Sequence, residues 1–176
     1  MKNYVLVLIV LGLTNQMIAQ KNVAIVIKKN GIHYNKANFK TASRPVKNIA
    51  YLTAVKDDYI SKKIVKFQNI VASYNIKNAK VYSPKRRTTY TVKFRENNSR
   101  VTAIYNKDGE LLSCKENYQA IRLPYRLSSQ LAKQYPGWKF KQIHCDIQYI
   151  KDTPTTLLYT VVLEHESKTK TVKLSA

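Results

Sequence analysis

The chain has 176 residues, and its 31 lysines and arginines against 10 aspartates and glutamates give it a formal charge of +21. Its length suits one ordinary domain with one core. Two cysteines exclude a cysteine-stapled scaffold, and four glycines exclude a glycine-rich phosphate-binding loop. The positive charge predicts an attraction for polyanions.

The first residues predict a signal peptide at 1–19. Lys2 is followed by a run of ten largely apolar residues, Tyr4 to Leu13, and cleavage is expected between Ala19 and Gln20. Ten residues are too few to span a bilayer, and no later stretch reaches the roughly 18 apolar residues that a membrane helix needs. We therefore expect an exported protein, periplasmic or extracellular, with no transmembrane segment in the mature chain.

Residues 20–60 form a basic lead-in whose fold the sequence leaves uncertain. Eight basic residues and no acidic one occur from Lys21 to Lys56, and the only apolar run, Val23 to Ile27, is a candidate edge strand. A second basic patch follows in a loop opened by Ser83-Pro84. Its residues, Lys85, Arg86 and Arg87, are the candidate polyanion-binding residues. The alternative is a charge that reflects a generally basic, lysine- and asparagine-rich composition.

The segment Ile60 to Asn78 carries a three- and four-residue apolar spacing. One face of a helix would hold Ile64, Phe67, Ile70, Val71 and Tyr74, although the β-branched content also suits a strand. We predict a helix here.

From Thr88 the pattern has a period of two. Tyr90, Val92 and Phe94 alternate with polar residues, as in a half-buried strand. A second strand from Arg100 to Tyr105 and a third from Glu110 to Glu116 are joined at Asp108-Gly109, which supplies the positive φ of a tight hairpin. This region is predicted to be an antiparallel meander.

A helix is then predicted to begin at Pro124 and to end at Pro136-Gly137, with Leu127 and Leu131 on one face. Strands around 143–149, 157–163 and 168–174 follow. For 61–176 the sequence therefore predicts an α+β domain. Its order is about three strands, a helix and about three more strands, and the strands form an antiparallel sheet that packs against the helix.

These pieces, in this order, carry a family resemblance. The runs YTVKF and IYNKDGELL, the Leu123-Pro124 helix start, YPGWKF, and then IQYI and LLYTVVL resemble the PepSY-like, β-lactamase-inhibitor-like family of secreted Bacteroidota-type proteins. The resemblance covers roughly Ile64 to Leu174. It implies a small antiparallel sheet clasping a helix and a surface that could block an enzyme, whereas a fold alone does not identify a target.

Trp138, the only tryptophan, follows the Pro136-Gly137 turn. We interpret it as a packing residue that covers the helix end where the next strand enters the sheet. The alternative is a recognition surface formed with Tyr125 and Tyr135.

No catalytic, cofactor-binding or metal-binding residues are predicted, and we do not expect an enzyme. His33, His144 and His165 are isolated, and strand geometry places His144 and Cys145 on opposite faces. Glu164 and Glu166 flank His165 but offer too few ligands for a structural metal site. Cys114 and Cys145 could form one disulfide after export.

Two functions therefore stay open. The first is a non-catalytic binding or inhibitory module that engages an envelope protein. The second is an electrostatic binder of anionic envelope polymers. Nucleic acid is not the expected partner.

Overall fold

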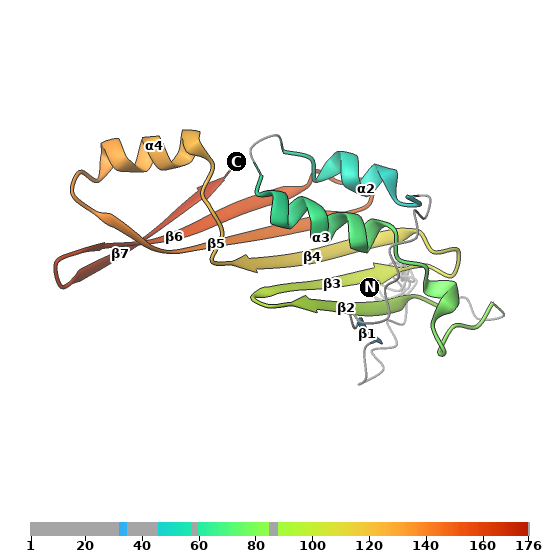
Figure 1. Cartoon of the computed structure of the whole chain (residues 1–176). Coiled ribbons are helices and arrows are strands. Elements are labelled where there is room, and N and C mark those ends of the chain that lie inside the picture. The colour runs from blue at the N-terminus through green and yellow to red at the C-terminus, as the bar shows by residue number, and fades with distance from the viewer. Residues whose placement is uncertain (1–31, 35–45, 58–59, 85–87, 176) are drawn as a thin grey trace, which may run out of the picture.

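The computed structural model describes residues 32–34, 46–57, 60–84 and 88–175. Seven strands form one sheet in the order in which they occur in the chain, and the helices lie along one side of it (Figure 1). In chain order the elements are β1 (Ile32–Tyr34), α2 (Ile49–Ala54), α3 (Lys62–Ala72), the 3-10 helix η2 (Ile76–Asn78), β2 (Tyr90–Glu96), β3 (Ser99–Tyr105), β4 (Leu111–Gln119), α4 (Tyr125–Gln134), β5 (Lys139–Ile150), β6 (Thr156–His165) and β7 (Lys168–Ser175).

The predicted fold class is wrong. Strands β2 to β7 are not two groups packed against one helix but a single antiparallel sheet, with β1 added in parallel at the edge of β2. Two helices that precede the sheet, α2 and α3, cover most of its core. The prediction failed because the pairing of β4 with β5 across α4, and the packing of α2 and α3 on the sheet, join segments that are distant in the chain.

Individual elements agree better with their patterns. The helix predicted within 60–78 is α3, which buries Ile64, Phe67 and Val71. The alternation predicted from Thr88 is confirmed in β2, where Tyr90, Val92 and Phe94 are buried. The edge strand predicted at 23–27 lies outside the described residues.

The turns obey simple backbone rules. The β3–β4 hairpin turns at Gly109, whose φ of +87° is the left-handed conformation that glycine adopts without strain. Helix α4 ends before Gly137, whose φ is +80°, and a Cβ at this position would lie 3.4 Å from the His165 ring. Both Gly109 and Gly137 therefore sit where another residue would be strained.

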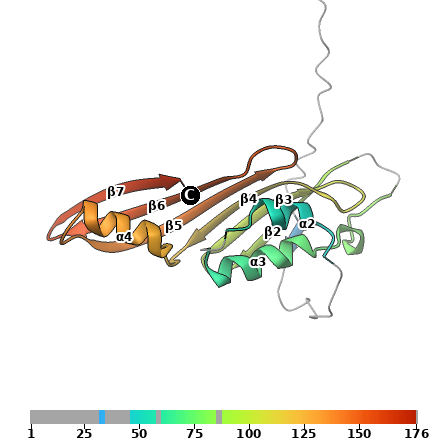
Figure 2. The ribbon, with the colours of Figure 1, turned by 90° about the horizontal axis from the view of Figure 1, so that it is seen from above.

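The helices divide the covered face between them. Seen from above, α4 lies over the end of the sheet formed by β5 to β7, and α2 and α3 lie over the part nearer β2 to β4 (Figure 2). Leu131 of α4 packs with Val161 and Leu163 of β6 in a small cluster. The larger core contains aromatic side chains from both layers, including Tyr51, Phe67, Phe94, Tyr105 and Tyr118. Their edge contacts, such as Tyr51 with Tyr149 at 5.2 Å between ring centroids, add to the area that they bury.

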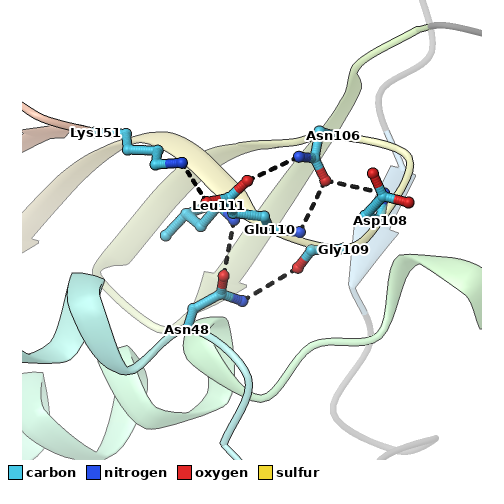
Figure 3. A network of polar contacts seen from close by, with 7 residues as sticks. All are labelled: Asn48, Asn106, Asp108, Gly109, Glu110, Leu111 and Lys151. Atoms are coloured by element: carbon cyan, nitrogen blue, oxygen red, sulfur yellow. Dashed lines mark hydrogen bonds and ion pairs between the residues drawn. The ribbon is translucent and has the colours of Figure 1, made fainter.

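Part of the predicted lead-in belongs to this core. Asn48, which precedes α2 and is 5% exposed, donates from Nδ2 to the carbonyl oxygens of Ala72 and Gly109 and accepts the Leu111 N–H at 2.8 Å (Figure 3). Beside it, Asn106 Oδ1 accepts the N–H groups of Asp108 and Glu110, and Lys151 pairs with Glu110. One amide side chain thus joins α2, α3 and the β3–β4 hairpin.

Candidate binding face of the sheet

The sheet has two faces of different character. Because successive strand residues point to opposite sides, the register assigns each side chain to a face. All three α-helices lie on one face, and within the described residues no helix lies on the other, which we call the open face (Figure 1). Its side chains are Thr91, Lys93 and Arg95 of β2; Arg100, Thr102 and Ile104 of β3; Ser113, Lys115, Asn117 and Gln119 of β4; Lys139, Gln142, His144, Asp146, Gln148 and Ile150 of β5; Thr156, Leu158, Thr160, Val162 and Glu164 of β6; and Thr169, Thr171, Lys173 and Ser175 of β7.

The open face carries an excess of positive charge. Both of its carboxylates have partners, because Asp146 accepts the Asn117 amide at 2.8 Å and Glu164 pairs with Lys141. None of its lysines and arginines has an ion pair or a side-chain hydrogen bond within the described part of the chain. These cations are Lys93, Arg95, Arg100, Lys115, Lys139 and Lys173.

Four of them form a cluster on β2, β3 and β4, which we call the cation cluster: Lys93, Arg95, Arg100 and Lys115. Arg95 stands directly opposite Arg100, and Thr102 lies between Lys93 and Lys115 in the next row. Side chains opposite one another on adjacent strands are about 5 Å apart at Cβ, and like charges in that position destabilise a sheet. The cluster is therefore an arrangement that folding alone does not favour.

A shallow hollow adjoins the cation cluster. It has a volume of about 160 Å³ and lies over β3, β4 and β5. A β-bulge between Ile104 and Tyr105 lies at its rim, and bulges often occur next to binding sites. The open-face residues that line it are Thr102, Ile104, Ser113, Lys115, Gln148 and Ile150.

The open face offers no aromatic platform within the described strands. The strand tyrosines, among them Tyr105, Tyr118 and Tyr159, point to the covered face and are buried. Ile150, 43% exposed, is the one open-face residue among the exposed large apolar side chains. Stacking of bases or insertion of large apolar groups is therefore not what this surface is built for.

The covered face contains a buried carboxylate that sequence reasoning missed. Glu116 of β4 is 0% exposed. Its Oε1 accepts the Tyr51 hydroxyl at 2.6 Å, and its Oε2 accepts the Tyr118 hydroxyl at 2.6 Å and the Gln68 amide at 3.1 Å. The sequence contains part of the information needed to find this site. Cys114, Glu116 and Tyr118 are two residues apart along β4, so a strand places all three on the same face.

Burial decides the protonation chemistry of this site. Loss of solvent raises the pKa of Glu116, and the hydrogen bonds from Tyr118, Tyr51 and Gln68 oppose that rise. Burial also raises the pKa of Cys114, and it raises that of Cys145 to about 12. Carboxyl and thiols are thus enclosed and held toward their neutral forms, which suits structural groups better than nucleophiles or bases.

The structure places His144 and Cys145 on opposite faces of the sheet, as strand geometry predicts. Cys145 is buried opposite Tyr118 and Tyr159, whereas His144 and Asp146 lie on the open face. In the described residues, no cluster of three histidine, cysteine or acidic side chains is arranged to hold a metal ion.

The possible disulfide between Cys114 and Cys145 is not formed in this fold. Both thiols are free, and Cys114 is opposite Tyr149, four residues along β5 from Cys145. Four strand residues span about 13 Å. A disulfide needs Cα atoms within roughly 7 Å.

Trp138 packs at the corner that the sequence predicts. It is partly buried against the cluster of Leu131, Val161 and Leu163. Its ring contacts Tyr135 at 6.3 Å and His165 at 5.6 Å between centroids. The indole thereby joins the end of α4 to the β6–β7 hairpin, and Tyr125, which is 83% exposed at the other end of α4, is not part of this group.

The basic patch that was singled out from the sequence, Lys85, Arg86 and Arg87, lies outside the described residues. None of the helices in the described part of the chain has the length and apolar character needed to cross a membrane.

Comparisons with protein-family models, with curated proteins and with solved structures gave no match for this chain. The PepSY-like resemblance therefore stays a prediction, and the function has to be argued from the geometry.

Proposed function

We propose that this protein is an exported, non-catalytic binding module whose open sheet face engages an anionic polymer of the cell envelope. The observation that carries the proposal is the cation cluster together with Lys139 and Lys173, six positive side chains that have no ion pair within the described residues, on a face that no described helix covers. The formal charge of +21 extends the same attraction over the whole molecule.

The composition of the face favours a polymer over a protein partner. Protein interfaces are centred on buried aromatic and apolar anchors, with Arg, Trp and Tyr prominent. The open face presents arginines but no aromatic side chain within the described strands, and Ile150 is its one exposed large apolar residue. Polar hydroxyl and amide groups, as at Thr102 and Gln148, instead suit a hydrated polymer.

The chemistry on the covered face is consistent with a non-catalytic role. Glu116, Cys114 and Cys145 are buried beneath the helices, and the hydrogen-bond acceptors of Glu116 are taken by side chains from α2, α3 and β4. A substrate would have to displace these helices to reach them.

The test is capture of envelope polymers and proteins by the immobilised chain from Gln20 onward, at low salt and at about half-molar salt. A variant with Lys93→Glu and Lys115→Glu removes the charge from the open face. Lys62→Glu and Lys63→Glu on the outer side of α3 are the matched control, because both are exposed and make the same charge change.

Anionic polymers that bind at low salt, leave at high salt and are lost in the open-face variant but not in the α3 variant are the expected result, because exposed charge pairs are screened by salt. Equal loss in both variants would show that only the net charge matters. A single protein retained at high salt by both variants would replace the proposal with the inhibitory module.

A further inference from the structure

The open face holds two adjoining features that a uniform basic surface would not need. One is the cation cluster, and the other is the hollow between Ile104, Ser113 and Ile150. They share Lys115, Thr102 of the hollow lies beside Lys93 of the cluster, and the Arg95–Arg100 pair lies in the next row of the sheet. Residues two apart on a strand are about 7 Å apart, so one small ligand can reach both features.

The arginine pair suits a tetrahedral anion. Each guanidinium presents a planar fork of donors that binds two oxygens at once. Because Arg95 and Arg100 are opposite each other and have no other partner in the described part of the chain, their forks can converge on one group. A phosphate or sulfate ester with three terminal oxygens satisfies two forks, whereas a carboxylate has only two oxygens to share.

The hollow suits a compact polar carrier of that group. Its volume of about 160 Å³ is well below the 300 Å³ or more of pockets for drug-sized ligands, and it equals roughly five water volumes. The surface exposed inside the hollow is mostly apolar, and polar residues such as Thr102, Ser113 and Gln148 are among those that line it. An apolar floor suits the less polar face of a sugar ring, whose hydroxyl groups would point outward from the floor.

We propose that the hollow and the cation cluster form one subsite for a sugar residue carrying a phosphate or sulfate ester, with the ring in the hollow and the ester on Arg95 and Arg100. This inference rests on the proposed function and names the repeating unit of the polymer. The shared chemistry is the tetrahedral ester, and the experiment separates its two forms. Lipid bilayers are a poorer fit because the open face has only Ile150 as an exposed large apolar residue within the described strands.

The experiment measures binding of the mature protein to dextran phosphate, dextran sulfate, plain dextran, inorganic polyphosphate and polyglutamate of matched charge density, at one fixed low salt concentration. We expect one or both dextran esters to bind at least tenfold more tightly than polyglutamate and polyphosphate, and plain dextran to bind weakly. The tighter ester identifies the anion.

Two variants test the two halves of the subsite. Ser113→Leu fills the hollow and is expected to weaken dextran-ester binding at least tenfold while leaving polyphosphate within twofold. Thr171→Leu, exposed on β7 of the same face, is its matched control. Arg95→Lys with Arg100→Lys keeps the charge but removes the forks, and it is expected to weaken ester binding at least fivefold with little effect on polyglutamate.

The outcomes distinguish failure of the subsite proposal from failure of the proposed polymer-binding function. If all polyanions bind equally and Ser113→Leu has no effect, the subsite is overturned while a charge-driven binding face stands. If no polymer binds to a wild-type protein that unfolds cooperatively in urea, both proposals fail. Urea midpoints of each variant close to that of the wild type show that a loss of binding is not a loss of folding.

Discussion

The two faces of the sheet differ in whether their charged side chains have partners, although neighbouring residues of the same strands supply both faces. On the covered face, the buried carboxylate of Glu116 accepts hydrogen bonds from three donors. On the open face, Arg95 and Arg100 stand opposite each other, and neither has a partner in the described part of the chain. The covered face thus satisfies its buried carboxylate within the fold, whereas the open face presents the charges on which the proposed interaction with a polymer rests.

The largest change in stability is expected at Glu116, and its neighbour Lys115, which points to the opposite face, provides the comparison. Glu116→Ala leaves three buried donors unpaired beside a cavity and is expected to lower the free energy of unfolding by about 3 to 5 kcal/mol. Lys115→Ala is expected to change it by less than about 0.5 kcal/mol. Urea unfolding of both variants measures this, and similar losses would remove the contrast between the faces.

A smaller loss is expected at the junction of the lead-in with the sheet. Asn48→Ala leaves the buried Leu111 N–H without its acceptor, and we expect the free energy of unfolding to fall by about 1 to 3 kcal/mol. Asn69→Ala is the matched control, because that amide is exposed and bonds only within α3. If both variants lose the same amount, α2 does not depend on Asn48 for its attachment.

The pH dependence should also differ between the faces. The folded-state pKa of Glu116 lies above its ordinary value of 4.5, so the native state binds this proton more tightly than the unfolded chain does. The stability from this carboxyl is complete below about pH 4.5 and is lost as pH rises toward the folded-state pKa. Glu116→Gln, which cannot lose the proton, should become more stable relative to wild type as pH increases. A constant difference in urea unfolding between pH 4 and 8 would contradict a raised pKa.

The smallest expected change is a gain in stability. Arg100→Gln removes one member of the like-charged pair and is expected to raise the free energy of unfolding by about 0.5 kcal/mol at low salt, with the gain shrinking as salt is added. The same variant should bind anionic polymers less well. A loss of stability instead would mean that Arg100 has a structural role.

Local sequence signals predicted most elements of the fold. The period of two in β2, the apolar spacing of α3 and the corner at Trp138 all depend on residues close together in the chain. The fold class was wrong and the possible disulfide is not formed, because both depend on how distant segments are paired. Helix α2 is too short to show a period, and the separation of Cys114 from Cys145 follows from the β4–β5 register.

For the candidate site, the sequence predicted the class of ligand but not the position of the cation cluster. The sequence pointed to polyanions through its charge, and it located the binding residues at Lys85, Arg86 and Arg87, which lie outside the described residues. The cation cluster escaped notice because its members are spread over three strands and meet only when those strands pair.

What the sequence by itself determined is therefore the charge, the alternation within each strand and the turns at Gly109 and Gly137, since these depend on residue type and near neighbours. The tertiary structure decided which strand face the helices cover and which distant side chains meet there. Tyr51 reaches Glu116 across 65 positions of the chain, and Arg95 meets Arg100 only across a hairpin. Such contacts follow from packing and strand register, which no single segment specifies.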